Sequence, residues 1–253
     1  MMRWLAIAIA LISPAPVLAQ GATIERLEEL KDVPEPPAFR ANLPARTEVG
    51  EIPLPRDQGD TSSCVSWAVT YAAGSQAVRR SGLPGTAALA PSFTYNQITR
   101  DRTCLSVTSI AKTLDFLRDN GALPIDEFVF DAGSCARMPT DEERRHAQRY
   151  RIKGWSRFDA TDPEAVKGQL ARGVPVIFAM RVGTKVRGHR GDSVIDSDFG
   201  EIGGHAMLAV GYDDSRKAFR IQNSWGKAWG DGGYAWFSYA FWKRNVRVGF
   251  VID

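Results

Sequence analysis

The spacing of apolar residues changes along this chain, from helical in the first half to strand-like in the second. One early segment repeats apolar residues at intervals of three and four: Val65, Ala68, Val69 and Ala72. This pattern predicts a helix with one buried face, from about Cys64 to Arg80. From Val176 onward, short runs of β-branched and aromatic residues predict strands instead. Helices followed by strands favour an α+β fold or two packed lobes.

Capping residues and turn residues set the bounds of the expected elements. Ser62 and Ser63 are candidate caps for the first helix, and Ser81-Gly82 ends it. We expect further helices at about 107–119, after the capping box of Thr140 and Glu143, and from Asp162-Pro163. The expected strands are Val176–Val182, His205–Tyr212, Ala218–Gln222, Gly233–Ser238 and Val246–Ile252.

The first 19 residues have the pattern of an export signal. Arg3 precedes a short apolar run, Trp4 to Ile12, and Val17-Leu18-Ala19 has the form of a cleavage site. The run is shorter than the roughly 20 residues that a membrane-spanning helix needs. We therefore expect a soluble mature protein, secreted or periplasmic, that no longer contacts a membrane. Residues 20–42, which are charged and Pro-rich, read as a short tether or vestigial pro-segment before a domain at 43–253.

Composition excludes several classes of partner. The 253 residues are 44% apolar and 24% charged, with a net charge of +3, which gives no reason to expect a nucleic-acid partner. The few Cys and His residues are too scattered for a structural zinc site, so we expect neither metal nor cofactor. After signal cleavage an odd number of cysteines remains, Cys64, Cys104 and Cys135, and sequence alone leaves their connectivity open.

Cys64 stands where a reactive thiol is expected. A cysteine in the first turn of a helix lies at the positive end of the helix dipole, which favours the nucleophilic thiolate. Gln58 precedes it by six residues, in a loop that can fold back over the helix start. Its amide and the Cys64 backbone N–H are then candidate donors to an oxyanion.

Two later blocks supply a candidate base and its orienting partner. His205 opens an apolar strand and follows Gly203 and Gly204, which remove side chains that would crowd a cleft. Asn223 begins the block Asn-Ser-Trp-Gly, and its side-chain oxygen can accept a hydrogen bond from an imidazole. Trp225 can cover that hydrogen bond. Each feature alone also fits a structural histidine or a tight turn.

Together, the Gln, Cys, His and Asn blocks resemble the papain family of cysteine peptidases. His205 and Asn223 follow Cys64 by 141 and 159 residues, against about 130–150 in the family pattern. The resemblance covers roughly Leu43 to the C-terminus. It implies a two-lobe fold with a helical lobe at about 43–150, a β-barrel-like lobe at about 151–253, and the active-site cleft between them. It also implies a Cys104–Cys135 disulfide in the helical lobe.

Within that resemblance, Cys64 is the expected nucleophile, His205 the base, Asn223 its orienting residue and Gln58 an oxyanion donor. Val107, Gly203, Gly204 and Trp225 are expected to contact a peptide or protein substrate, and the protein is expected to be a monomer. Departures from the family pattern are Thr61, Val65 and the Leu105-Ser106-Val107 stretch, which put substrate preference in doubt more than activity.

Three further questions remain open at this stage. The family's long inhibitory propeptide has no counterpart here, so we expect a nearly competent enzyme after signal cleavage, with residues 20–42 at most brushing the cleft, and the sequence leaves open whether they inhibit. A papain-like binding module without catalysis is one alternative to a peptidase. A transamidase or deamidase that uses the same acyl-enzyme is the other.

Overall fold

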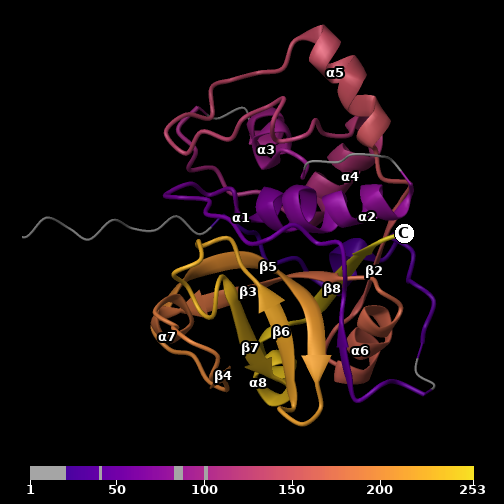
Figure 1. Ribbon diagram of the computed structural model, residues 1–253, viewed down its shortest axis with the longest axis vertical. Coiled ribbons are helices and arrows are strands. Elements are labelled where there is room, and N and C mark those ends of the chain that lie inside the picture. The colour runs from indigo at the N-terminus through magenta and orange to yellow at the C-terminus, as the bar shows by residue number, and fades with distance from the viewer. Residues whose placement is uncertain (1–20, 40–41, 83–87, 100–101) are drawn as a thin grey trace, which may run out of the picture.

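The computed structural model describes residues 21–39, 42–82, 88–99 and 102–253. Helices α1 to α5 gather in one half of the molecule, and the sheet fills the other half (Figure 1). The expected α+β class is confirmed, and the arrangement has the two parts that the resemblance implied. The expected signal at residues 1–19 lies outside the described residues. Within them, no helix has the length and apolar character needed to cross a membrane.

The helix that begins at Cys64 is continuous to Arg80, as predicted. It consists of α1 (Cys64–Ser66), a wider π-helical stretch η2 (Trp67–Gly74) and α2 (Ser75–Arg80). Every residue from Cys64 to Gln76 is buried, because the helix lies between the other helices and the sheet. The predicted cap is wrong in detail, since the Ser63 side chain makes no capping bond and its hydroxyl lies 2.6 Å from the Thr61 hydroxyl.

The remaining helices surround this central one or cover the far side of the sheet. The capping box of Thr140 and Glu143 is confirmed, with hydrogen bonds of 2.8 and 3.2 Å in the two directions. Asp162 caps the next helix as expected, through Glu164 N. The elements are η1 (Leu27–Leu30), α3 (Pro91–Thr99), α4 (Ile110–Asn120), α5 (Asp141–Ala147), η3 (Gln148–Tyr150), α6 (Pro163–Ala171), α7 (Thr184–Arg187) and α8 (Tyr239–Asn245).

One mostly antiparallel sheet runs in the order β2-β8-β3-β5-β6-β7-β4, and β1 pairs with β5 outside this path. Among the described residues, β2 and β4 end the path unpaired with each other, so the expected barrel-like sheet is not closed. The strands are β1 (Arg46–Glu48), β2 (Trp155–Asp159), β3 (Val176–Gly183), β4 (Val194–Ile195), β5 (Glu201–Asp213), β6 (Ala218–Gln222), β7 (Tyr234–Ser238) and β8 (Val248–Ile252).

Strand β5 joins the two halves of the core, because its side chains alternate between the two faces of the sheet. Ala206 and Leu208 belong to the cluster that contains Cys64 and the central helix. Met207 and Ala209 belong to the cluster on the other face, which includes residues of α6 and α8. The site at the start of β5 therefore lies where the helices meet the sheet.

Residues 21–37, called the strap from here on, run along the surface of both halves. Leu30 is buried, and its carbonyl accepts a 3.0 Å hydrogen bond from Arg157 Nε on β2. The Arg157 backbone N–H donates to the Pro34 carbonyl at 3.0 Å. Gln169 of α6 donates to the Pro37 carbonyl at 3.1 Å. These bonds fix the C-terminal part of the strap against the sheet half.

Candidate active site

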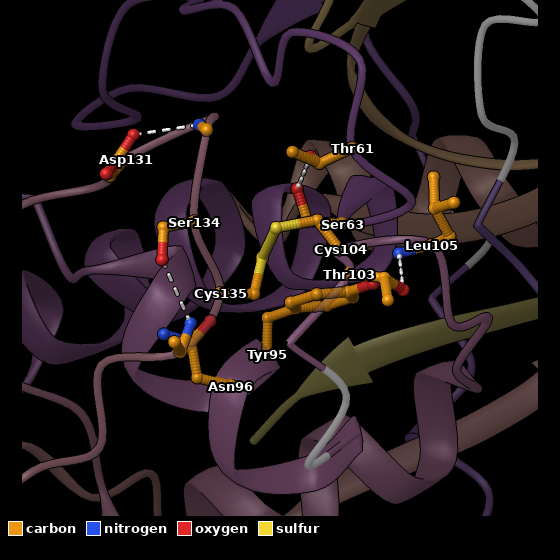
Figure 2. Close-up of a disulfide and its surroundings, with 12 residues drawn as sticks. Thr61, Ser63, Tyr95, Asn96, Thr103, Cys104, Leu105, Asp131, Ser134 and Cys135 are labelled. Carbon is orange, nitrogen blue, oxygen red and sulfur yellow. Dashed lines mark hydrogen bonds between the residues drawn. A yellow bond between two sulfur atoms is a disulfide. The ribbon is translucent and has the colours of Figure 1, made fainter.

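Cys64 is the first residue of α1, and its approach loop is held in place by a disulfide. Cys104 and Cys135 are bonded to each other, which leaves Cys64 as the free thiol. The carbonyl of Cys104 accepts a 2.7 Å hydrogen bond from the backbone N–H of Ser62. Figure 2 shows Tyr95 beside the disulfide, with Thr61 and Ser63 joined just beyond Cys104. The disulfide thus fixes the loop that leads into the thiol.

His205 and Asn223 come from two neighbouring strands and meet through their side chains. His205 lies on β5, and Asn223 directly follows β6, which pairs with β5. His205 Nε2 and Asn223 Oδ1 are 2.7 Å apart. The Trp225 ring stacks on the imidazole, with 4.2 Å between centroids and an interplanar angle of 23°. Both His205 and Asn223 are buried, so this hydrogen bond is kept from water.

Gln58 is fixed against the same turn that carries Asn223. Its backbone N–H donates to the Ser224 carbonyl at 2.9 Å, and its side-chain Oε1 accepts from Ser224 Oγ at 2.6 Å. Its Nε2 donates to the Thr61 carbonyl at 2.6 Å. An amide NH₂ has two hydrogens, so one donor of Gln58 remains for another acceptor near the start of α1.

The thiol and the imidazole are both buried in their neutral forms. Burial raises the pKa of Cys64 to about 11, against the lowering effect of the Ala206 and Gly21 backbone N–H groups. Burial lowers the pKa of His205 to about 3, which outweighs the bond to Asn223. His205 Nδ1 has no hydrogen-bond partner among the described residues. The backbone N–H groups of Ala206, the residue after His205, and of Gly21 lie at the Cys64 sulfur, and the sulfur forms no hydrogen bond with His205 Nδ1.

The N-terminal end of the strap packs against the residues around the buried thiol. Ala22 N donates to the Gly204 carbonyl at 3.1 Å, immediately before His205. Gly21 and Thr23 pair with the main chain of Thr108 on the helical side, through two hydrogen bonds of 2.9 Å each. Residues 21–23 therefore bridge both walls around Cys64, which is 0% exposed.

A half-buried carboxylate holds the next residues of the strap. Glu25 accepts hydrogen bonds from Ile110 N at 3.0 Å and Ala111 N at 2.9 Å, at the start of α4. These N–H groups have no partner within the helix, and the helix dipole favours an anion there. Desolvation nevertheless raises the pKa of Glu25 above its usual range. Glu25 thus fixes the strap to the helical half.

Comparison with known proteins identifies this arrangement. The sequence model described as papain family cysteine protease matches residues 41–244. The chain belongs to the papain family. The match includes Gln58, Cys64, His205 and Asn223, whereas the strap precedes it.

Relatives and solved structures agree with this family assignment. An uncharacterised peptidase C1-like protein of Acanthamoeba polyphaga mimivirus is 26% identical over 204 residues, which are 73% of this chain and 64% of that protein. The chain thus spans less than two thirds of this relative. The crystal structure of xylellain, a cysteine protease from Xylella fastidiosa, matches with a TM-score of 0.81 at 22% identity, covering 96% and 99% of the two chains. Digestive procathepsin L 3 of Tenebrio molitor larval midgut has a TM-score of 0.70 at 16% identity, covering 94% of this chain and 77% of that one. These two likenesses concern the fold.

The other residues that the papain-family pattern suggested differ in their contacts and exposure. Gly204 and Trp225 contact the strap and His205, respectively. Gly203 adopts a φ of +143°, which favours glycine. Val107 is 58% exposed, and the neighbouring residue Thr108 supplies the main-chain pairing with the strap.

Sequence reasoning left one part of this papain-family site open and missed another. The contact of residues 21–25 with the cleft is made largely by main-chain atoms, which leave little trace in side-chain patterns. Gly21 was the only signal, since a small residue permits close approach of two backbones. Ser224 was named only as part of a block, although its hydroxyl positions the Gln58 amide.

Proposed function

We propose that this protein is a cysteine peptidase in which Cys64, His205 and Asn223 hydrolyse peptide bonds. The observation that carries the proposal is the 2.7 Å bond between His205 Nε2 and Asn223 Oδ1. This bond occupies one ring nitrogen and leaves Nδ1 for the thiol at the start of α1. Membership of the papain family supports the same reading.

In the proposed reaction the Cys64 thiol transfers its proton to His205, and the thiolate attacks the carbonyl carbon of the peptide bond. The oxyanion accepts hydrogen bonds from the Gln58 amide and the Cys64 backbone N–H. His205 then protonates the leaving amine and the C–N bond breaks, which leaves a thioester. Water, deprotonated by His205, attacks the thioester and releases the acid and the thiol.

We further propose that the strap inhibits this reaction. It covers Cys64, and its main chain occupies the hydrogen-bonding groups of Thr108 and Gly204 that a peptide substrate would use. In this covered state burial favours the neutral thiol and the neutral imidazole. Because burial disfavours both charged forms, a thiolate–imidazolium pair requires the strap to leave and water to reach the site.

The remaining expectations belong to the same proposal. Residues 43–253 form the catalytic domain, with its helical lobe at about 43–150 and its β-rich lobe at about 151–253, and act as a monomer. The protein is exported to the periplasm or the medium after removal of residues 1–19. An oxidising compartment suits the Cys104–Cys135 disulfide. N-terminal sequencing of the exported protein should begin at Gln20, and a chain that retains residues 1–19 would contradict export by cleavage.

The peptidase activity is tested with a mixed peptide library. The full chain carrying Gly21→Ala, which displaces the strap for reasons given below, is incubated with the library, and new α-amines are counted by mass spectrometry. Cleavage that disappears in the Cys64→Ser variant supports the proposal. Ammonia release from glutamine side chains without cleavage would assign a deamidase. If neither new α-amines nor ammonia formed, the binding module would be the remaining interpretation.

A further inference from the structure

Arg187 is a partly buried cation near the candidate site. It is the last residue of α7, and its guanidinium carbon lies 4.4 Å from the Trp225 ring. Within the described part of the chain, no carboxylate forms an ion pair with it and no group forms a hydrogen bond with its side chain. Its five N–H donors are therefore available to a ligand.

Trp225 connects Arg187 to the base of the proposed reaction. The same tryptophan stacks on His205 at 4.2 Å, so the guanidinium and the imidazole each contact one indole. The charge of Arg187 also acts on His205, where it lowers the pKa in the same direction as burial. Arg187 thus lies on the His205 side of the site, one ring away from the imidazole.

The part of the substrate that leaves with the amine must lie close to His205 and therefore near Arg187. His205 can protonate the leaving amine only if that nitrogen comes within hydrogen-bond reach of the imidazole. The acyl part has main-chain partners elsewhere, at Thr108 and Gly204, which the strap uses. Since each residue of an extended chain spans about 3.3–3.6 Å, the first two leaving residues can bring a side chain or chain end to Arg187.

A guanidinium stays charged in proteins even where burial lowers its pKa, and the charges around Arg187 limit which ligands it accepts. Burial lowers the pKa of Arg187, while Asp57 and Asp60 raise it and Arg190 lowers it further. Asp57 and Asp60 attract the guanidinium without forming an ion pair with it. They also repel any anionic ligand that approaches Arg187 from their side. A ligand must therefore offset this repulsion with directed hydrogen bonds, as a carboxylate does when it binds a guanidinium through both oxygens.

We propose that Arg187 binds a carboxylate on the leaving part of the substrate, within two residues of the cleaved bond. This inference rests on the proposed peptidase function and adds a substrate class to it. The carboxylate has two possible sources, an Asp or Glu side chain and the free C-terminus of a peptide. In the first case the enzyme selects acidic sequences within proteins. In the second it releases short fragments from chain ends.

The test uses four peptides that share one acyl part, chosen from the library profile. In the first pair, the residue directly after the cleaved bond is Asp in one peptide and Asn in the other, and both peptides have an amidated C-terminus. In the second pair, a neutral dipeptide follows the cleaved bond, and its C-terminus is a free acid in one peptide and an amide in the other. Three full-length proteins are compared, all with Gly21→Ala: the parent, Arg187→Gln and Arg190→Gln. Arg190 is the matched control, because it is an exposed arginine in the loop after α7, and among the described residues its guanidinium bonds only to the carbonyl of His189.

The readout is the ratio of kcat/KM within each matched peptide pair, with the cut bond identified by mass spectrometry. The parent and Arg190→Gln should prefer the carboxylate in at least one pair by about tenfold or more, as charged hydrogen bonds allow. Arg187→Gln should bring that ratio close to one. A loss of stability or of Trp225 packing alone would slow both peptides of a pair and leave the ratio unchanged.

The outcomes separate this inference from the function on which it rests. A preference in the Asp/Asn pair assigns a side-chain carboxylate, and one in the acid/amide pair assigns the chain end. Turnover without preference in the parent, or a preference that survives Arg187→Gln, overturns the role of Arg187 and leaves the peptidase intact. If the parent cleaved none of the four peptides and the library showed no Cys64-dependent cleavage, both the role of Arg187 and the peptidase function would be overturned.

Discussion

Gly21 lies against the backbone of Ser62 so closely that a Cβ atom on Gly21 would be 1.7 Å from the Ser62 carbonyl oxygen. Ser62 lies two residues before Cys64, so this contact lets the strap reach the thiol. A second glycine serves the same approach from the other wall, since a Cβ on Gly204 would lie 2.1 Å from the Ala22 carbonyl oxygen. The fit of the strap therefore depends on residues without side chains.

Gly21→Ala should activate the enzyme. The added methyl group cannot coexist with the Ser62 carbonyl, and a displacement penalty of only about 1.4 kcal/mol changes the open population tenfold. We expect turnover of a library-derived peptide to rise by about tenfold or more. The control is Gly50→Ala, because a Cβ at Gly50 meets no atom within 4 Å. Equal turnover of wild type and Gly21→Ala would show that the strap does not inhibit. Gly21→Ala tests the strap more specifically than truncation at Leu43, because truncation also removes the buried Leu30 and so changes the packing of the core.

The pH dependence of Cys64 alkylation should report the position of the strap. With the strap in place the thiol has a pKa of about 11, so the thiolate fraction is negligible at pH 5 and grows as the pH rises. In Gly21→Ala the exposed thiol, at a helix start and beside His205, should have a depressed pKa and react with iodoacetamide at pH 5. Cys64→Ser is the blank. If wild type and Gly21→Ala reacted equally fast at pH 5, burial of the thiol would be refuted.

Gln58→Ala should slow turnover while leaving the thiol reactive. The loss of one oxyanion donor typically costs about 2.7–4 kcal/mol of barrier, or about a hundredfold or more in kcat. Alkylation by iodoacetamide forms no oxyanion, so its rate in the Gly21→Ala background should change little. If both rates fell together, Gln58 would be acting through the fold, and unchanged turnover would remove it from the mechanism. Ser224→Ala, which removes one of the two side-chain hydrogen bonds that hold Gln58, should give a smaller loss.

Removal of the disulfide should destabilise the protein. Cys104 and Cys135 are 31 positions apart, and closing a loop of that length contributes about 3–4 kcal/mol in the chain-entropy model. Urea unfolding of Cys104→Ala/Cys135→Ala should show a loss of that order. The variant should also bind the strap more weakly, because the Cys104 segment leads to Thr108. An unchanged unfolding midpoint would contradict the structural role of the disulfide.

The sequence predicted elements where local signals and burial agree. The capping box at Thr140 and Asp162-Pro163 identified two helices, and the alternating strands from Val176 onward appeared near their predicted bounds. Helix α3 was missed because it is buried on several sides and carries buried polar residues such as Thr94 and Asn96, so it has no apolar stripe. Strand β2 was missed for a similar reason, since Ser156 is buried and bonds to Asp253.

The candidate site divides in the same way. Cys64, His205 and Asn223 were found because the reaction requires particular side chains, and these stand in recognisable blocks. Arg187 escaped notice because its relation to Trp225 arises only when α7 folds over the turn after β6. Glu25 was hidden as well, since an acidic residue in a charged segment reads as solvated until α4 is seen to begin beside it.

Under the proposed inhibition, the attachment of the strap to β2 sets how the protein responds to dilution and to competitors. Bonds from Arg157 to Leu30 and Pro34 lie apart from the cleft and can persist after residues 21–25 have swung away. The inhibitory end then rebinds as part of the same molecule, at an effective concentration of the order of millimolar. Dilution therefore does not activate such an enzyme. Activation requires either a substrate at a comparable concentration or cleavage of the strap by another protease between the cleft and Leu30.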